Sequence, residues 1–302
     1  MKQELPLVSI VTPSYNKGAF IEETILSIKN QTYPRIEHIV IDGGSTDNTI
    51  EILKKYKGTY IMQWISEPDQ GGADAINKGW RMSHGQILAY LHADDTYIPN
   101  AVEVAVQFLS EHPEVSMVYG DSTVIDEHNR LLYFYRSRQF NLKELVCGIS
   151  MPPPTLILRR EVLSEAGYLD TDLYGWDYYF WLRVGLRLKV QQIPYLLTNY
   201  RHYPGTKSSS ESYRFYPEYL YMLDKIFTNY ALPDEIKSVR NQAYSYAHLR
   251  IGLQYLGQHQ WEQALKHLMK SAILYPPHLT KALLLPKVAI SFVRKKVRQM
   301  TT

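Results

Sequence analysis

The first 125 residues alternate between two hydrophobic patterns. Short apolar runs typical of buried strands are separated by stretches in which apolar residues recur every three or four positions, which is typical of helices. The apolar runs are 7–13, 37–42, 60–66, 87–95 and 115–121. Strands that alternate with helices predict βαβ units and a mostly parallel central sheet flanked by helices. We therefore expect an α/β fold in this part of the chain.

The segments that directly follow the expected strands are where we look for chemistry. In open α/β sheets, ligands bind outside the carboxyl ends of the strands. Aspartate occurs in four of the five segments, which are 12–16, 42–48, 67–77, 92–95 and 120–122. These segments are therefore expected to converge on one crevice.

Two adjacent carboxylates, Asp94 and Asp95, end the run 87–95. Successive residues of an extended segment point to opposite faces, so the two side chains can serve different partners. A Mn²⁺ or Mg²⁺ ion on a diphosphate takes one or two protein carboxylates and completes its shell with phosphate oxygens. We assign Asp95 to such an ion and Asp94 to the ribose of a bound nucleotide or to a supporting role. The simpler alternative is that one of them caps the helix after Pro99.

Asp42 lies at the end of the second expected strand, in the segment IDGGSTDNT. A carboxylate there can accept a hydrogen bond from a uracil imide, and the two glycines allow a close approach of the backbone to a ligand. The alternative is a capping role at the next helix, which Ser45 or Thr46 can also perform. Asp47 is better placed to complement the helix dipole than to bind a ligand.

The remaining candidates come from the first and third strand ends. The segment TPSYN contributes Thr12, Pro13 and Tyr15, with the tyrosine as a stacking platform for a base and the proline fixing the loop. Asp74 and Asn77 are three residues apart in GADAIN, so a short helix would show both on one side. Asn77 has the alternative of a purely local packing role.

Several common enzyme classes lack their motifs here. The chain has no GxGxxG after the first strand, no GxxxxGK[ST] and no GxSxG, and its histidines show no HExxH spacing. The single cysteine, Cys147, excludes a disulfide within the chain and a cysteine-based zinc site. A net charge of +3 gives no argument for a nucleic-acid partner.

The order of these motifs from about residue 7 to 210 resembles that of the family 2 glycosyltransferases. LHADD is similar to the family's DXD-type metal motif, and IDGGSTD to its nucleotide-contacting aspartate segment. GWDYYFWLR resembles the family's ED motif, with Trp176 where an acid is frequent and Asp177 as the candidate base. YRHYPGTKSS resembles a later loop that carries a histidine, but Tyr203 stands at that place. This shift argues against His202, next to Arg201, as a metal ligand.

The resemblance implies a GT-A type fold, a nucleotide-diphosphate sugar donor such as a UDP-sugar, a divalent cation, and inversion at the anomeric carbon. Asp177 would take the proton from an acceptor hydroxyl, and the cation would stabilise the leaving diphosphate. The acceptor expected is a glycan or a lipid-linked sugar, in the synthesis of a surface polysaccharide or glycolipid. The alternative for Asp177 is a cap of the helix YYFWLRVG, where the helix N-terminus would lower its pKa.

The expected domains are a glycosyltransferase domain at 1–210 and a helical extension at 211–302. The nucleotide-binding half of the first is placed at 1–125 and the acceptor half at 126–210. The extension contains one tetratricopeptide-like helix pair, which cannot bury its own faces alone. Its basic tail, 281–302, either lies on an anionic membrane surface or docks as a terminal helix.

No secretory signal or membrane-spanning run is evident in the sequence, so the expected location is cytoplasmic, with peripheral contact to the inner face of the cell membrane. Two rival functions remain open at this point. One is a scaffold for a polysaccharide-assembly complex, which the acidic positions argue against. The other is a sugar-phosphate nucleotidyltransferase, which should have a glycine-rich loop with an arginine after the first strand, whereas TPSYNKG has neither feature.

Overall fold

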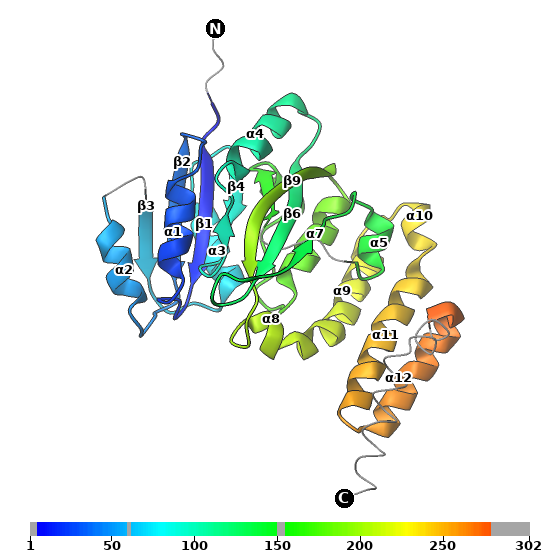
Figure 1. The fold of residues 1–302 in the computed structure, drawn as a ribbon. Helices are drawn as coiled ribbons and strands as arrows, with labels where there is room; N and C mark the ends of the chain where they lie inside the picture. The colour runs from blue at the N-terminus through cyan, green and yellow to red at the C-terminus, as the bar shows by residue number, and fades with distance from the viewer. Residues whose placement is uncertain (1–4, 59–61, 150–154, 279–302) are drawn as a thin grey trace, which may run out of the picture. The chain divides into compact units, whose positions relative to one another are not determined.

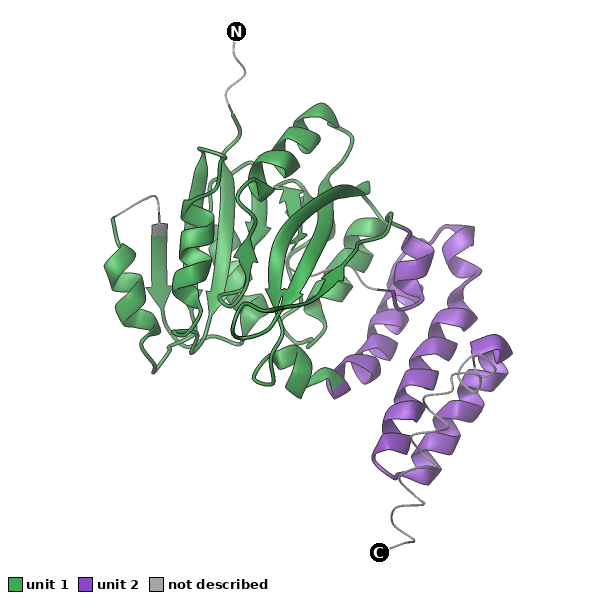
Figure 2. Cartoon of the chain, in the orientation of Figure 1, with its two compact units in different colours: residues 1–140, 150–212 green, residues 141–149, 213–302 purple. Residues whose placement is uncertain are grey.

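A computed structural model of the 302-residue chain describes residues 5–58, 62–149 and 155–278. The chain divides into two compact units, coloured separately in Figure 2. Unit 1 consists of residues 1–140 and 150–212, and unit 2 of residues 141–149 and 213–302. The segment 141–149 groups with the helical unit, which the sequence patterns did not indicate. The basic tail at 281–302 lies outside the described residues.

Unit 1 is built on one sheet, in which the described residues contribute nine strands in the order β3-β2-β1-β4-β8-β6-β9-β5, with β7 paired to β6 (Figure 1). The strands are β1 (Val8–Ser14), β2 (Ile36–Asp42), β3 (Met62–Ser66), β4 (Ile87–Tyr90), β5 (Thr96–Tyr97), β6 (Met117–Ile125), β7 (Leu131–Tyr135), β8 (Ile157–Arg159) and β9 (Val190–Arg201). The pairs β3–β2, β2–β1, β1–β4 and β6–β9 are parallel, while β8 runs antiparallel between β4 and β6. The expected α/β fold with a mostly parallel sheet is confirmed.

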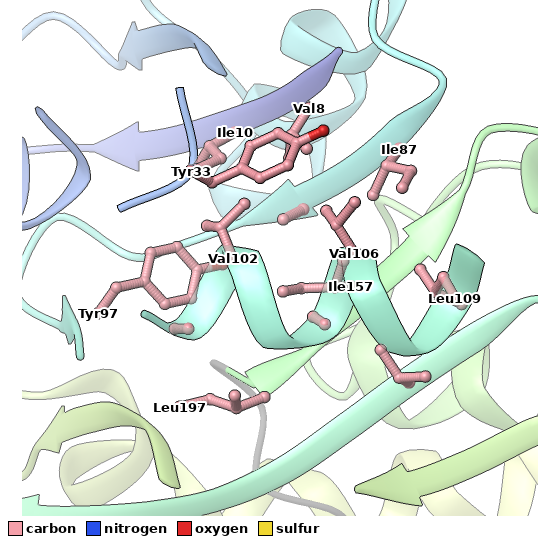
Figure 3. Packing of buried hydrophobic residues seen from close by; sticks show 14 of the residues in the cluster. Val8, Ile10, Tyr33, Ile87, Tyr97, Val102, Val106, Leu109, Ile157 and Leu197 are labelled. Atoms are coloured by element: carbon pink, nitrogen blue, oxygen red, sulfur yellow. The ribbon is translucent and has the colours of Figure 1, made fainter. Parts of the chain in front are cut away.

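Helices cover both faces of this sheet. The helices of unit 1 are α1 (Ile21–Lys29), α2 (Thr49–Tyr56), α3 (Gly72–Met82), α4 (Ala101–Glu111), α6 (Val162–Ala166), α7 (Trp176–Gly185) and α8 (Lys207–Ser210). Val102 and Val106 of α4 pack with Val8 and Ile10 of β1 in a fully buried cluster (Figure 3). Alternate residues of a strand face opposite sides, so Val11 points to the other face, where it meets α3. This alternation gives the central strands their near-continuous hydrophobicity.

Gly79, in the middle of α3, sets how closely that helix approaches β1. A Cβ atom at this position would lie 2.4 Å from Cγ1 and 2.7 Å from Cγ2 of Val11. We expect Gly79→Ala to lower the free energy of unfolding by about 1–2 kcal/mol, because overpacking costs up to about 3 kcal/mol and exceeds the roughly 1 kcal/mol gain in helix propensity. Urea unfolding of both proteins measures this difference.

The matched control for this change is Gly257→Ala, at the end of a helix of unit 2. No atom lies within 4 Å of the Cβ position there. The control should leave the free energy of unfolding unchanged or raise it slightly. Equal stability of Gly79→Ala and wild type would show that α3 can move away from β1 at no cost.

Unit 2 is all-helical, with α5 (Leu142–Val146), α9 (Phe215–Asn229), α10 (Asp234–Lys237), α11 (Arg240–Gly257) and α12 (Trp261–Leu274). Helix α11 packs against both α9 and α12. A three-residue turn at 258–260, with His259 at φ 60°, joins α11 and α12 into a helical hairpin. The expected C-terminal helical region is therefore present, while its kinship to tetratricopeptide repeats stays a prediction. Among the described helices, none has the length and hydropathy needed to cross a membrane.

Candidate active site

The strand ends of unit 1 meet in a network of hydrogen bonds, as their positions in the sequence predict. Parallel pairing brings Ser14 of β1 opposite Asp42 of β2. The loop after β1 then contacts the loop after β2, because Asn16 N donates to Ser45 Oγ and its Oδ1 accepts from Thr46 N, at 2.7 and 2.8 Å. From the same loop, the Lys17 ammonium reaches Asp94 after β4 at 2.6 Å.

Asp42 is fully buried and organises the loop after β2. Its Oδ2 accepts from the backbone N–H of Ser45 at 2.8 Å and of Gly44 at 3.1 Å, and from Ser66 Oγ at 2.7 Å. Its Oδ1 accepts from Ser45 Oγ at 2.5 Å. Both carboxylate oxygens of Asp42 therefore already accept hydrogen bonds from the chain itself. Its predicted contact with a nucleobase stays untested.

Asp69, which the sequence analysis did not single out, lies next to this loop. A Cβ atom added to Gly43 would lie 2.9 Å from Asp69 Oδ2, so the carboxylate faces the glycine pair directly. Burial raises the pKa of Asp69, and the charges of Asp74 and Asp42 add to this, against the Gly71 N–H and Lys78. The sequence feature that could have identified Asp69 is its place in EPDQGG, after β3 and beside a second glycine pair. A carboxylate facing a glycine loop is a stronger donor-site candidate than one with both oxygens in use.

Asp94 belongs to a three-membered polar cluster. Lys17 Nζ lies 2.6 Å from its Oδ2 and donates to Tyr203 Oη at 2.7 Å, and that hydroxyl donates to Asp94 at 3.2 Å. Burial lowers the pKa of Lys17, but the charge and hydrogen bond of Asp94, with those of Tyr203, outweigh burial and raise it. The ammonium therefore stays charged and compensates Asp94.

Asp95 has a different environment from its neighbour. Its side chain is 1% exposed, and Oδ1 accepts from the backbone N–H of Arg201 at 2.7 Å. Its Oδ2 has no hydrogen-bond partner among the described residues. Burial, and next the charge of Asp94, raise its pKa well above the usual value. An orphaned buried carboxylate oxygen of this kind needs a proton or a cation.

The strand expected at 87–95 ends earlier, at Tyr90. Residues 91–95 form a turn in which Asp95 N donates to His92 O at 3.0 Å. The two carboxylates still diverge, but the turn separates them rather than the pleat of a strand. Neither of them caps α4, whose N-cap residue is Asn100.

Arg201, at the end of β9, holds this turn in place. Its side chain is fully buried, and Nε donates to Asp94 O at 2.8 Å. The rest of the guanidinium donates to Asp126 O, Asn129 Oδ1 and Glu23 Oε2. Since Arg201 N also donates to Asp95, this residue positions both carboxylates.

Asp177 is the second residue of α7, whose N-cap is Gly175, so it is not the cap itself. Burial raises the pKa of its carboxyl to about 6, against the lowering effect of the Tyr178 N–H, its own N–H and the charge of Lys207. The sequence analysis expected the helix N-terminus to lower this pKa. Desolvation is the larger effect here, and it leaves a carboxylate suited to act as a base near neutral pH.

The charges of Asp177 and Asp95 both act on the buried tyrosines Tyr90 and Tyr200. The buried hydroxyls of Tyr90 and Tyr97 have no hydrogen-bond partner in the described part of the chain. Burial raises the pKa of Tyr90, and the charges of Asp177, Tyr97 and Asp95 add to this. Burial also raises the pKa of Tyr200, and the charges of Asp95 and Asp177 add to this. Three unpartnered buried polar atoms near a base are groups that a polar ligand could engage.

The other predicted residues are placed less directly. Tyr15 is 59% exposed at the end of β1, open for stacking. Thr12 is fully buried in β1, and its hydroxyl lies 2.8 Å from His38 Nε2, so the side chain is bound inside the sheet. Pro13 lies in the same strand and pairs with Ile41.

The last three predicted residues have different surroundings; they are Asp74, Asn77 and His202. Asp74 accepts from Gln70 N at 3.2 Å, and its charge acts on Asp69. Asn77 is buried and bonds the backbone of Leu169 in both directions, at 2.9 and 3.0 Å, so it packs locally. His202 donates its backbone N–H to Ile125 O at 2.8 Å, and its ring lies 6.3 Å from that of Tyr200. Its role as a metal ligand remains without support.

A divalent cation fits the residues present only with help from a ligand. No three His, Cys, Asp or Glu side chains gather as a ready-made metal site in residues 5–58, 62–149 and 155–278. The unpartnered Oδ2 of Asp95, beside Asp94, supplies one or two oxygen ligands. This is the number expected for an ion that diphosphate oxygens complete.

Known proteins resemble this chain in sequence and in fold. The sequence matches the family described as Glycosyl transferase family 2 over residues 9–167. WfgD of Escherichia coli, a UDP-Glc:alpha-D-GlcNAc-diphosphoundecaprenol beta-1,3-glucosyltransferase, is 29% identical over 180 residues, which are 59% of this chain and 69% of WfgD. An uncharacterized glycosyltransferase of Mycobacterium tuberculosis is 34% identical over 188 residues, which are 60% of this chain and 70% of that protein.

Two solved structures share the fold. S. aureus TarS in complex with UDP-GlcNAc has a TM-score of 0.65 at 19% identity, over 88% of this chain and 81% of that one. The mannosyltransferase PcManGT from Pyrobaculum calidifontis, with GDP-Man and Mn²⁺, has a TM-score of 0.66 at 20% identity, over 98% and 83%. The GT-A type fold that the resemblance implied is thus confirmed. With the family match over more than half its length, the chain belongs to glycosyl transferase family 2 and is a glycosyltransferase.

Proposed function

We propose that this enzyme transfers a sugar from a nucleoside diphosphate donor, most simply a UDP-sugar, to a hydroxyl of a glycan or lipid-linked acceptor, with inversion. The observation that carries the proposal is the pairing, across Tyr90, of a buried carboxylate with an orphaned oxygen, Asp95, and a carboxyl whose pKa burial raises to about 6, Asp177. The first can hold a cation and the second can take a proton. Both are needed for a metal-assisted displacement on a sugar phosphate.

In the proposed step, Asp177 accepts the proton of the acceptor hydroxyl while that oxygen attacks the anomeric carbon. The bond between this carbon and the phosphate oxygen breaks, and the diphosphate leaves with the electron pair. A single displacement from the opposite face inverts the anomeric centre. Mn²⁺ or Mg²⁺ held by Asp95, with Asp94 beside it, would supply charge stabilisation to the leaving diphosphate.

The other residues of the proposed site bind the donor or orient the two carboxylates. Lys17, charged and 2.6 Å from Asp94, provides a second positive group at the position expected for the diphosphate. Tyr15 is open to stack on the nucleobase, and Asp69 faces the glycine loop after β2. Arg201 keeps the 91–95 turn rigid, so that the two carboxylates need little reorganisation.

The relatives support the substrate classes proposed. WfgD bears the name of an enzyme that acts on a UDP-sugar and a diphosphoundecaprenol-linked acceptor, and the structures of TarS and PcManGT hold nucleotide sugars. Surface polysaccharide or glycolipid synthesis at the inner face of the membrane is the role we propose. Family membership favours this reaction over the nucleotidyltransferase alternative.

A donor panel tests the proposed function. Release of nucleoside diphosphate is measured from UDP-, GDP- and dTDP-sugars with Mn²⁺, with Mg²⁺, and with EDTA. We expect turnover of at least one UDP-sugar, and loss of that turnover with EDTA. Release from none of the donors, in the presence of polyprenyl-diphosphate sugars as acceptors, would contradict the proposal.

A further inference from the structure

The outer side of α12 in unit 2 carries large apolar side chains that are exposed to solvent. Leu265, Met269 and Ile273 are 60%, 55% and 78% exposed. They are spaced by four residues, so they lie along one side of the helix and form what we call the outer stripe. Trp261 continues the same spacing one turn earlier, is 53% exposed, and also has its ring 6.0 Å from that of His259.

The opposite side of α12 is already used for packing. Ala264 and Ser271 are fully buried against α11, and Ser245 Oγ donates to Ser271 O at 2.9 Å. The two helices approach so closely that a Cβ atom on Gly252 would lie 2.9 Å from Leu268. The helix therefore cannot turn its outer stripe inward without breaking this contact. An apolar stripe fixed in this orientation marks an interaction surface.

Charge identifies the kind of partner. Residues 261–302 contain eight of the chain's 33 lysines and arginines, but one of its 30 acidic residues. Two of the eight, Lys266 and Lys270, are exposed on α12 itself, adjacent in sequence to Leu265 and Met269. A helix that carries apolar residues on one side and lysines beside them suits the surface of an anionic bilayer.

The same charge disfavours two other partners that could cover the stripe, a second copy of the chain and the segment 281–302. A second copy of the chain would bring its own lysines against Lys266 and Lys270, at a repulsive cost. The basic residues between 281 and 302 would meet the same repulsion if that segment covered the stripe. A surface of anionic lipid headgroups is attracted instead, and it accepts the apolar side chains below the phosphate level.

We propose that the outer stripe of α12, with Lys266 and Lys270, docks the protein on an anionic lipid bilayer. Leu265, Met269 and Ile273 enter the boundary between headgroups and acyl chains. The two lysines place their ammonium groups at the lipid phosphates, with their methylene stems along the apolar surface. None of these residues belongs to the proposed sugar-transfer site, and docking requires neither donor nor acceptor, so this proposal does not depend on the proposed function.

Vesicle sedimentation with the full chain tests the proposal. We compare vesicles of phosphatidylcholine alone with vesicles that contain phosphatidylglycerol, at low and at physiological salt. Wild type should bind the anionic vesicles and not the neutral ones. The variant Leu265→Ser, Met269→Ser, Ile273→Ser should bind at least about tenfold more weakly, because it loses most of the inserted apolar surface.

The strand β7 offers a matched control. Leu131, Leu132 and Phe134 are 52%, 49% and 63% exposed in unit 1, so their replacement by serine removes a comparable apolar surface elsewhere. This control should bind vesicles like wild type. A further variant, Lys266→Gln with Lys270→Gln, should lose about tenfold in affinity and most of the salt dependence of binding. Circular dichroism and thermal unfolding confirm that each variant is folded.

Three results would overturn the proposal. Unchanged binding of the stripe variant would place membrane contact elsewhere, for example at 281–302. An equal loss in the β7 control would indicate non-specific adsorption of apolar surface. A wild-type dimer in sedimentation velocity that the stripe variant abolishes would identify a second copy as the occupant. In each case nucleotide-sugar turnover on soluble acceptors, measured in parallel, stays unaffected and keeps the two proposals separate.

Discussion

Replacement of Asp177 by asparagine is expected to lower kcat for sugar transfer by about 10²- to 10⁴-fold, the usual contribution of a general base. Asparagine keeps the size of the side chain and an oxygen to accept the Tyr178 N–H, which now lies 2.8 Å from Asp177 Oδ1. The amide cannot take a proton from an acceptor hydroxyl. Donor affinity should remain within about threefold of wild type, since we propose that the diphosphate binds at Asp95 and Lys17 instead. Kinetics with a varied donor and calorimetric donor binding measure the two quantities.

Measurements of stability distinguish a loss of catalysis in Asp177→Asn from a loss of folding. The pKa of Asp177 in the folded protein, about 6, lies above its ordinary value of 3.8. The folded state therefore binds the proton more tightly, and this carboxyl lowers stability as the pH rises through the interval between the two values. Asparagine has no such cost, so Asp177→Asn should be at least as stable as wild type above pH 6. A variant that is both inactive and unfolded would leave the assignment of the base without support.

The matched control for this change is Asp172→Asn, an exposed aspartate five residues earlier. It should retain wild-type kcat. A loss in the control equal to that of Asp177→Asn would mean that the segment before α7, rather than one carboxylate, determines activity.

The second large effect is expected at Asp95. Asp95→Asn can keep the bond from Arg201 N through its oxygen, but it replaces the unpartnered Oδ2 by an NH₂ group, which cannot ligate a cation. We expect the Mn²⁺-dependent part of donor affinity to fall by about a hundredfold, and turnover to fall with it, because the diphosphate loses its charge partner.

Titration of donor binding with Mn²⁺ measures this effect, with Asp172→Asn again as the control. Without Mn²⁺, wild type and Asp95→Asn should bind the donor equally weakly. Equal Mn²⁺ dependence of the two proteins would remove Asp95 from the metal site. The variant should also be no less stable than wild type, since burial already raises the pKa of this carboxyl in the folded protein.

Much of unit 1 follows from local patterns in the sequence. The apolar runs 7–13, 37–42 and 115–121 correspond to strands Val8–Ser14, Ile36–Asp42 and Met117–Ile125. Burial of both faces explains why these runs are so clearly marked. The end of β4 at Tyr90 was missed because Leu91 and Ala93, in the following turn, are also buried and read as strand.

Apart from Asp177, which was located through its resemblance to a family motif, the candidate site could be predicted only next to strand ends in the sequence. Asp42, Asp94 and Asp95 were found in this way. Lys17 and Tyr203 contact each other across 186 residues, and no periodicity relates them. Tyr90 and Tyr97 were hidden as ordinary apolar positions, because their hydroxyls matter only once the fold has buried them.

The pKa of Asp177 could not be predicted from the sequence for a related reason. A helix N-terminus is visible in the sequence and lowers a carboxyl pKa, whereas burial of the carboxyl depends on the tertiary structure and raises the pKa. The larger of the two effects appears only in the folded protein. The surroundings of Asp95 likewise could not be predicted, because its hydrogen bond comes from Arg201, 106 residues further along the chain.

The dependence of kcat/KM on pH tests the central claim most directly. Nucleoside diphosphate release from the preferred UDP-sugar is followed from pH 5 to 8 at saturating Mn²⁺, for wild type and Asp177→Asn. For wild type we predict an acid limb with a midpoint near 6, the pKa to which burial raises Asp177. The residual rate of Asp177→Asn should lack this limb. The same acid limb in both proteins would contradict the assignment of Asp177 as the base.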